Sequence, residues 1–286
     1  MKRFVLAGLL AVSAAAMPAG EGQNPTFSSR VEAVRVDVLV TEDGKPVRGL
    51  RAADFEVFDN GVRQAVDFVS SEQLPLNVVF TFDLSSSIVG DRLDNLREAS
   101  RAALDGLKAG DQAALVMFNT TVAVGPDLTS RTSLVQAAID NAEPMGETSL
   151  VDASFAGMMV AEADAGRGLV MVFSDGRDTS SWLRPEAIVD VAKRCDAVVY
   201  GVASGMARRS EFLGTLADQT GGRLFKIEST KGLSDVFLEV LDEFRQRYLL
   251  SYSPAGVSRD GWHTLTVRVK GRNAGVRARP GYLAGQ

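Results

Sequence analysis

The chain has 286 residues, of which 45% are hydrophobic and 23% are charged, and these values are typical of a folded globular protein. Its formal net charge of -5 at pH 7 argues against general nucleic-acid binding, because such binding requires a surplus of Lys and Arg that neutralises phosphates. The length fits one large domain or two modest ones.

Residues 1–19 have the features of a secretory signal peptide. Lys2 and Arg3 precede an apolar stretch from Phe4 to Val12, and small residues follow up to Ala16. The apolar stretch is shorter than the roughly 20 residues that a membrane-spanning helix needs, and no later segment reaches that length. We therefore expect an exported protein without a membrane span, located in the periplasm, on the cell surface or outside the cell.

Residues 28–75 have the pattern of β-strands. Valines from Val34 to Val40 recur at every second position, and "FEVF" leads into "DNGVRQAVDFV". The pair Asn60-Gly61 favours a tight hairpin, because both residue types tolerate a positive φ. This segment predicts a small antiparallel β unit.

Residues 76–245 change to short apolar runs, each followed by a polar, helix-compatible segment. The runs are "LNVVFTF", "QAALVMF", "GLVMVFS", "AVVYGVA" and "RLFKI". Strands that are apolar on both faces and alternate with helices indicate a mainly parallel sheet covered on both sides. "TVAVGPDL" follows its preceding strand too closely for a helical crossover, so it predicts an antiparallel edge hairpin. The fold class expected here is α/β, with a doubly wound, Rossmann-like sheet.

Residues 246–286 return to the two-residue period in "RYLLSYSP", "WHTLTVRVK" and "GVRARPGYL". The β-type flanks before and after the α/β block are each too short to form a stable independent sheet. Joined, they would make one small β-sandwich. We therefore predict that an α/β domain at 76–245 is inserted into a β-sandwich formed by 28–75 and 246–286.

Polar side chains follow the first strand of the α/β block at once. Asp83, Ser85 and Ser87 have alternate spacing, so a sharp loop can aim all three side chains at one point. In an open doubly wound sheet, ligands bind at the carboxyl ends of the strands. A hard divalent cation such as Mg²⁺ prefers oxygen ligands and takes few carboxylates. The alternative is that Asp83 or a nearby serine only caps the following helix.

Two further segments favour the metal site over capping. "GETSLVDA" puts Thr148 in a loop before a helical stretch, and "VMVFSDGRD" puts Asp175 at the tip of a later buried strand. Asp175 therefore has the same topological position as Asp83. Three oxygen-rich loops at one edge of a sheet are hard to explain by helix capping alone, so we predict a divalent-cation site.

The motifs "DLSSS", "GETSL" and "FSDGRD" on a doubly wound sheet resemble the von Willebrand factor type A (VWFA) domain and its metal-ion-dependent adhesion site. The resemblance covers residues 76 to about 245. It implies that Mg²⁺ or Mn²⁺ is held by Ser85, Ser87 and Thr148, with Asp83 and Asp175 acting directly or through water. It also implies that a Glu or Asp of a protein partner completes the coordination sphere.

The sequence departs from the family pattern at two positions of this loop. Ser86 stands where glycine is common, and Ile88 stands where methionine is common in bacterial members. Both departures concern loop stiffness rather than the ligands. The flanks "VRVDVLVTEDGKPVRGLRAADFEVFDNG", "RYLLSYSP" and "GVRARPGYLA" are similar to a secreted bacterial VWFA-related family described mainly from acidobacteria.

The function expected from these features is metal-dependent protein binding or adhesion. Neighbouring side chains must supply specificity, because one ion contact gives only orientation. The loop positions suggest Met145, Glu147, Arg177 and Trp182. Trp182 has an alternative role, in which it packs against the helix that Pro185 begins.

The sequence gives little support for an enzyme. The only histidine, His263, lies in the C-terminal β segment, far along the chain from the metal loops. No G-x-S-x-G, G-x-G-x-x-G after the first strand or G-x-x-x-x-G-K-[ST] motif occurs. Two alternatives stay open: a cell-envelope scaffold whose ion only stabilises loops, and a Mg²⁺-dependent hydrolase.

The last helical segment of the α/β block, around Phe237 to Phe244, runs almost directly into the strand "YLLSY". A shift of this helix on ligand binding could be transmitted to the β flanks. This switch is a further hypothesis.

Overall fold

A computed structural model describes residues 33–70, 74–163, 166–205, 207 and 211–285. The described residues belong to one compact unit. The predicted signal peptide lies outside the described residues. Among the residues that are described, no helix is both long enough and apolar enough to cross a membrane.

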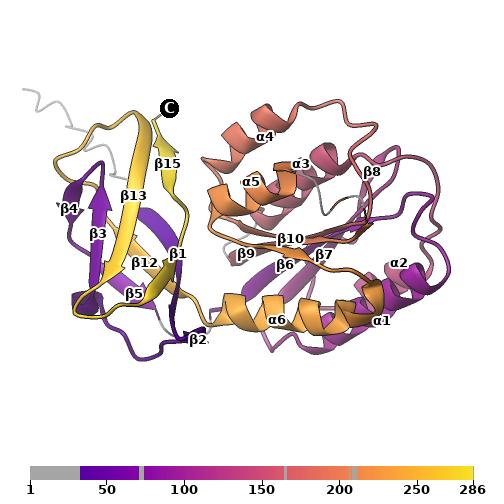
Figure 1. The fold of residues 1–286 in the computed structure, drawn as a ribbon, viewed down its shortest axis with the longest axis horizontal. Helices are drawn as coiled ribbons and strands as arrows, with labels where there is room; N and C mark the ends of the chain where they lie inside the picture. The colour runs from indigo at the N-terminus through magenta and orange to yellow at the C-terminus, as the bar shows by residue number, and fades with distance from the viewer. Residues whose placement is uncertain (1–32, 71–73, 164–165, 206, 208–210, 286) are drawn as a thin grey trace, which may run out of the picture. The chain divides into compact units, whose positions relative to one another are not determined.

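A central sheet has six strands in the order β11-β10-β9-β6-β7-β8 (Figure 1). All neighbours run parallel except β8, which pairs antiparallel with β7. The α/β fold and the antiparallel edge hairpin predicted from the sequence are therefore confirmed. The strands are β6 (Leu76–Asp83), β7 (Gln112–Phe118), β8 (Val122–Val124), β9 (Arg167–Ser174), β10 (Val198–Ala203) and β11 (Leu224–Lys226).

Helices cover both faces of this sheet, and each face has its own hydrophobic cluster (Figure 1). On one face, Phe82 of β6 stacks on Phe237 with ring centroids 5.6 Å apart. That face carries α1 (Asp91–Asp105), α2 (Thr132–Asp140) and α6 (Leu233–Arg245). The opposite face carries α3 (Leu150–Ala161), α4 (Pro185–Ala192) and α5 (Glu211–Thr220).

Strand β6 is the centre of the fold and carries the first candidate site residue at its end. All eight of its residues are buried, because it lies between β9 and β7 and is covered on both faces. Its nearly continuous apolar run encodes that position. Asp83 closes the strand and is itself fully buried, so a carboxylate is held at the carboxyl edge of the sheet.

The two flanks of the chain form two antiparallel sheets that share one hydrophobic cluster. Strands from both flanks pair directly, β1 with β12 and β3 with β13. One sheet has the order β14-β1-β12-β5 with β2 paired to β1, and the other has the order β15-β13-β3-β4. The strands are β1 (Val34–Glu42), β2 (Lys45–Pro46), β3 (Phe55–Asp59), β4 (Val62–Gln64), β5 (Phe68–Ser70), β12 (Tyr248–Tyr252), β13 (Gly261–Val269), β14 (Gly275–Arg277) and β15 (Gly281–Ala284).

The predicted hairpin at Asn60-Gly61 is confirmed. It joins β3 to β4, and the two residues have φ values of 47° and 80°. Short 3-10 turns, η1 (Ala52–Asp54) and η3 (Thr230–Gly232), precede β3 and α6.

A buried polar cluster links four strands of the two antiparallel sheets. The Asp59 carboxylate lies 2.7 Å from His263 Nδ1. It also accepts hydrogen bonds from the hydroxyls of Tyr252 at 2.9 Å and Tyr282 at 2.8 Å. The only histidine of the chain therefore contacts an aspartate and a tyrosine of the β region rather than the predicted metal loops.

Buried arginines fix the end of α6, where the chain passes into β12. Arg245 Nη2 lies 2.5 Å from Asp111 Oδ2. The other oxygen of this carboxylate, Oδ1, accepts a hydrogen bond from the Leu76 backbone N–H. Arg247 Nη2 donates to the Tyr200 hydroxyl at 2.8 Å and to the Gly221 carbonyl at 2.7 Å. A shift of α6 along its axis would have to break these contacts.

Candidate metal centre

The candidate site lies where β6 and β9 end side by side. These strands are parallel neighbours, and Phe82 pairs with Phe173 in the register. The next residues along the two strands, Asp83 and Ser174, are therefore adjacent, and the Ser174 hydroxyl donates a 2.6 Å hydrogen bond to Asp83 Oδ2. The parallel register thus brings together two polar side chains that are far apart in the sequence.

The loop after β6 turns sharply around the Asp83 carboxylate. The Ser85 backbone N–H donates to Asp83 Oδ1 at 2.9 Å, and the Ser85 and Ser87 hydroxyl oxygens lie 3.1 Å apart. Ile88 is fully buried in the core and anchors the far end of the loop. The loop therefore brings the Ser85 and Ser87 hydroxyls together, with the Ser85 backbone against the Asp83 carboxylate.

The loop after β9 contributes Asp175, which is also buried. The Ser87 hydroxyl donates to Asp175 Oδ1 at 2.6 Å. Arg92, in the first turn of α1, donates from Nη1 to Asp175 Oδ2 at 2.6 Å and to the Ser87 carbonyl at 3.0 Å. One carboxylate oxygen of Asp175 thus faces the serine loop, and the other faces a guanidinium group.

Thr148 reaches the same place from the loop before α3. A Cβ placed on Gly176 would lie 3.0 Å from Thr148 Oγ1 and 3.8 Å from Asp83 Oδ2. The threonine hydroxyl and the aspartate carboxylate therefore both lie within 4 Å of the position that a side chain at residue 176 would take, and such a side chain would crowd the hydroxyl. The backbone of this loop is tied to the loop after β9, since the Thr148 N–H donates to Thr179 Oγ1 at 3.1 Å.

The two departures from the family pattern are accommodated by the structure. Ser86 donates hydrogen bonds from its backbone N–H and its hydroxyl to the Gly146 carbonyl at 3.1 and 3.0 Å. Among the described non-glycine residues, only Asp43 and Asn60 have a positive φ, so position 86 does not require glycine. The serine instead adds a hydroxyl bond between the loop after β6 and the loop that carries Thr148.

The chemistry of the grouped side chains suits a hard cation. All five predicted ligands offer oxygen, from two carboxylates and three hydroxyls, and oxygen is the ligand that Mg²⁺ and Mn²⁺ prefer. Within the described ranges, no group of three or more His, Cys, Asp or Glu side chains could hold a metal ion. A cation at this site would therefore depend on the hydroxyls. The five residues are Asp83, Ser85, Ser87, Thr148 and Asp175.

The electrostatics of the site favour an added positive charge. Burial raises the pKa of Asp83 above its ordinary value, and the nearby Asp175 carboxylate raises it further, although hydrogen bonds from Ser174 and Ser85 oppose the shift. Ionisation of this buried carboxylate costs free energy, because burial removes the water that would solvate the charge. A divalent cation beside Asp83 would remove that cost.

The predicted partner-binding residues are exposed around this edge. Met145 is 56% exposed and Trp182 is 93% exposed, and Glu147 and Arg177 are exposed as well. The alternative in which Trp182 packs against the helix begun by Pro185 is wrong, because the indole is almost fully in solvent. The helix itself does begin at Pro185.

The backbone beside Trp182 is held firmly even though its side chain is free of the core. The Asp152 carboxylate accepts hydrogen bonds from the backbone N–H groups of Trp182 at 3.0 Å and Leu183 at 2.9 Å. The Ser180 hydroxyl lies 2.8 Å from the Ser149 hydroxyl, next to Thr148. The loop therefore presents a large apolar side chain from a fixed backbone.

Sequence reasoning missed three residues that organise the site, namely Ser174, Arg92 and Asp152. Ser174 lies in the quoted "FSDGRD" motif, so its position directly before Asp175 was a usable signal. Arg92 and Asp152 lie in the first turns of α1 and α3, which begin beside the metal loops. Helix starts next to candidate ligand loops were the signal that could have found them.

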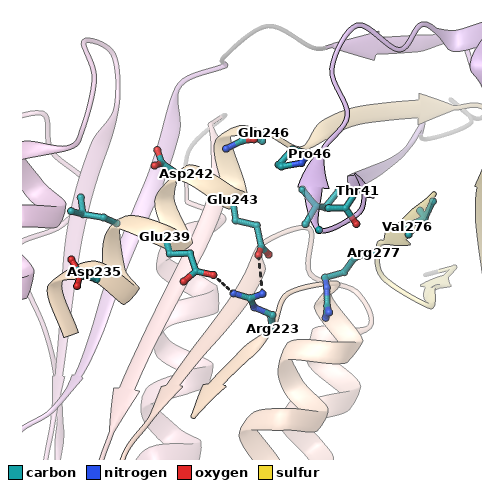
Figure 2. A pocket seen from close by; sticks show the side chains of 14 residues that line it. Thr41, Pro46, Arg223, Asp235, Glu239, Asp242, Glu243, Gln246, Val276 and Arg277 are labelled. Carbon is teal, nitrogen blue, oxygen red and sulfur yellow. Dashed lines mark hydrogen bonds and ion pairs between the residues drawn. The ribbon is translucent and has the colours of Figure 1, made fainter. Parts of the chain in front are cut away.

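A cleft of about 660 Å³ lies elsewhere, between α6 and the strands β1, β2 and β14, and Figure 2 shows the side chains that line it. Its lining includes none of the predicted site residues. Arg223 spans one wall through ion pairs with Glu239 at 2.5 Å and Glu243 at 3.5 Å (Figure 2). These ion pairs engage three of the charged residues that line the cleft.

The fold and the arrangement of loops at its edge define an A-type domain. The family model for the von Willebrand factor type A domain matches residues 77–239, which is more than half of the chain. The chain therefore belongs to the von Willebrand factor type A domain family.

Curated relatives include heavy chains of inter-alpha-trypsin inhibitor. The chain is 26% identical to heavy chain H2 of Mus musculus over 73% of its own length and 24% of that protein. It is 24% identical to heavy chain H4 of Homo sapiens over 69% of its length and 23% of that protein. The chain thus spans about a quarter of the length of these relatives.

Solved structures are similar at the level of the fold. A von Willebrand factor type A protein from Catenulispora acidiphila is 14% identical, with a TM-score of 0.55 over 80% of this chain and 72% of that chain. Proximal thread matrix protein 1 from the mussel byssus, solved with a zinc-occupied MIDAS motif, is 18% identical, with a TM-score of 0.54 over 64% of this chain and 48% of that chain.

Proposed function

We propose that this protein is an exported, metal-dependent module for protein binding or adhesion. The observation that carries the proposal is the meeting of oxygen atoms from three separate loops beside Gly176, at the carboxyl edge of the sheet. A cation at this edge would be close to the surface and within reach of a partner's side chain. Membership of the secreted VWFA-related family described mainly from acidobacteria is part of the same proposal.

The cation we propose is Mg²⁺, with Mn²⁺ as the alternative. Ser85, Ser87 and Thr148 would hold it through their hydroxyls. Asp83 is better suited to act through water, because each of its oxygens already accepts a hydrogen bond from the protein. The ion would act as a Lewis acid that accepts a Glu or Asp carboxylate from a protein partner. The zinc-occupied MIDAS motif of the mussel protein supports divalent-cation binding on this fold.

Specificity would come from the exposed residues around the ion. Trp182 offers a large apolar surface on a fixed backbone, and tryptophan is enriched among residues that dominate binding energies. Met145 adds a flexible apolar contact, while Glu147 and Arg177 supply charges of both signs at the rim. These residues would select among partners that all present an acidic side chain.

The flanking sheets would form the β-sandwich into which the A-type domain is inserted, with boundaries at 28–75, 76–245 and 246–286. Support comes from the direct pairing of strands from the two flanks and from their common hydrophobic cluster. We propose no catalytic role. His263 contacts Asp59 in the flanking sheets, which leaves it unsuited to activate a nucleophile at the metal loops.

The first test is metal binding by the purified protein. Isothermal titration with MgCl₂ and MnCl₂ should give one site, and Thr148→Ala should weaken it while Thr148→Ser retains it. Loss of one ligand hydroxyl is the only difference between these two variants at the ion. A full-length protein that bound neither metal would contradict the proposal.

The second test separates adhesion from a scaffold role. Envelope and culture-medium proteins of the source organism are captured in Mg²⁺, eluted with EDTA and identified by mass spectrometry. Each candidate is then purified and titrated against the wild type and Asp83→Ala. The adhesive function predicts that a folded Asp83→Ala variant loses the partner. The scaffold alternative predicts a lower melting temperature for Asp83→Ala and unchanged partner binding.

A further inference from the structure

Arg92 is in direct contact with a residue of the candidate metal site. Its Nη1 atom lies 2.6 Å from Asp175 Oδ2 and 3.0 Å from the Ser87 carbonyl oxygen. The two partners of the ion pair differ greatly in exposure, since the Asp175 side chain is 3% exposed and the Arg92 side chain is 50% exposed. A buried carboxylate is therefore paired with a side chain that has an open route to solvent.

The ion pair changes the charge that a metal ion would meet. Asp83 and Asp175 are the two carboxylates among the five candidate ligands, so the site has a formal charge of -2 when both are ionised. The guanidinium of Arg92 neutralises half of this charge. It also donates to one of the two oxygens through which Asp175 could hold a cation or a water molecule. A cation must therefore bind against a positive charge that already occupies one oxygen of Asp175.

The same contact supports the site in the absence of metal. A buried carboxylate that lacks a partner is costly, because it is removed from water without compensation. The Ser87 hydroxyl and Arg92 together satisfy both oxygens of Asp175. The loop after β6 and the loop after β9 are thus held together by protein groups alone.

We propose that Arg92 is an internal counter-ion of Asp175 that competes with the divalent cation. Cation binding displaces the guanidinium, which can leave because half of its surface is already in solvent. Arg92 thereby lowers the affinity of the site and keeps the two loops in position when no cation is bound. This inference rests on the proposed metal site and adds a residue that sets its affinity.

Two roles for Arg92 predict opposite results. A competitor weakens metal binding, so Arg92→Gln binds metal more tightly than the wild type. A group that only orients Asp175 for the metal strengthens binding, so Arg92→Gln binds more weakly. Arg92→Lys keeps the positive charge and should stay close to the wild type if competition is electrostatic.

The experiment is an isothermal titration of the full chain with MnCl₂ after EDTA treatment and desalting. We expect Arg92→Gln to bind Mn²⁺ about three- to tenfold more tightly, a modest factor because the guanidinium is partly screened by solvent. Arg101→Gln is the matched control. It removes the same charge from the same helix, and Arg101 pairs with Asp140 rather than with a site residue. An equal gain in Mn²⁺ affinity in Arg92→Gln and Arg101→Gln would mean that only the net charge of the protein matters, and it would overturn the proposal.

Thermal melting supplies a second readout. In EDTA, Arg92→Gln should melt below the wild type, because Asp175 loses its counter-ion. In saturating Mn²⁺ this difference should shrink, because the cation replaces the guanidinium. Unchanged or weaker Mn²⁺ binding by Arg92→Gln would overturn the proposal. If the wild type and Arg92→Gln both bind no Mn²⁺, the proposed metal site itself fails, whereas Mn²⁺ binding by Arg92→Gln alone would support strong competition.

Discussion

The Ser174 hydroxyl donates a 2.6 Å hydrogen bond to Asp83 Oδ2 and so joins the ends of the adjacent strands β6 and β9. Both side chains are fully buried. Ser174 also accepts a hydrogen bond from the Gly176 backbone at 3.2 Å. One hydroxyl thus orients the carboxylate of the first loop and the backbone of the second.

Ser174→Ala should therefore weaken metal binding without unfolding the protein. The variant loses a hydrogen bond to a charged group, which is worth about 1.5–3 kcal/mol. We expect a lower melting temperature in EDTA and a higher dissociation constant for Mg²⁺ by titration. Ser154→Ala is a control, since its buried hydroxyl bonds only within α3, to the Leu150 carbonyl. It should leave the metal affinity unchanged.

Asp83→Asn should make the thermal stability of the protein independent of added Mg²⁺. Burial raises the pKa of Asp83 above its ordinary value of 3.8, so the folded metal-free protein holds this proton to a higher pH than the unfolded chain does. Stability of the metal-free wild type therefore falls as the pH rises through that window. The asparagine variant lacks this loss.

We expect Asp83→Asn in EDTA at neutral pH to melt above the wild type, because the asparagine side chain does not ionise. Its melting temperature should not respond to MgCl₂, whereas the wild type should rise. Scanning calorimetry at several pH values measures both effects. A wild-type melting temperature that did not respond to MgCl₂ would contradict this prediction.

Gly146→Ala should damage the loop that carries Thr148. Gly146 has a φ of 68°, and an added Cβ would clash with the Thr120 side chain. Gly44→Ala is the matched control, because Gly44 has a φ of 75° but no atom within 4 Å of the added Cβ. Both variants incur backbone strain of about 1 kcal/mol, and only Gly146→Ala should also lower Mg²⁺ affinity. Urea denaturation and metal titration separate the two effects.

Trp182→Ala should affect binding and leave stability unchanged. The side chain is 93% exposed, so its removal should alter the free energy of unfolding by less than about 0.5 kcal/mol. Binding of an identified partner should weaken at least tenfold, as expected for a central aromatic contact. Mg²⁺ affinity should stay the same. If the alanine variant bound the partner with wild-type affinity, Trp182 would not be part of the binding surface.

Asp59→Ala should destabilise the protein without affecting metal binding. The variant leaves His263, Tyr252 and Tyr282 without their shared acceptor in a buried cluster. Removal of one partner from a buried charged network typically costs about 3–5 kcal/mol. Urea denaturation followed by circular dichroism measures the loss, with exposed Asp127→Ala as the control. A small effect would mean that the tyrosines find other partners.

Local sequence patterns predicted much of this architecture. The apolar run that ends at Asp83 identified the central strand, and Asn60-Gly61 identified a hairpin, because strand periodicity and turn chemistry are local properties. The pairing order within the two flanking sheets did not follow from sequence. Strand pairing between segments about 200 residues apart depends on long-range packing, which no local pattern encodes.

The candidate site was predictable in its loops but not in its contacts. Asp83, Ser85, Ser87 and Asp175 could be grouped because they lie at or just after the ends of two buried parallel strands. The contact of Arg92 with Asp175 depends on the direction of a long, flexible side chain, which sequence spacing leaves open. The exposure of Trp182 was equally undetermined, since an aromatic residue before a helix can pack on that helix or extend into solvent.

The most direct test of the proposed function is an anomalous difference map from crystals of the full chain grown with MnCl₂. We expect a single strong peak among the oxygens of Ser85, Ser87 and Thr148, within direct coordination distance of these hydroxyls. We also expect a coordination position on the solvent side that is filled by water or by a carboxylate from a neighbouring molecule. Well-ordered loops with no manganese peak among these three hydroxyls would contradict the proposed function.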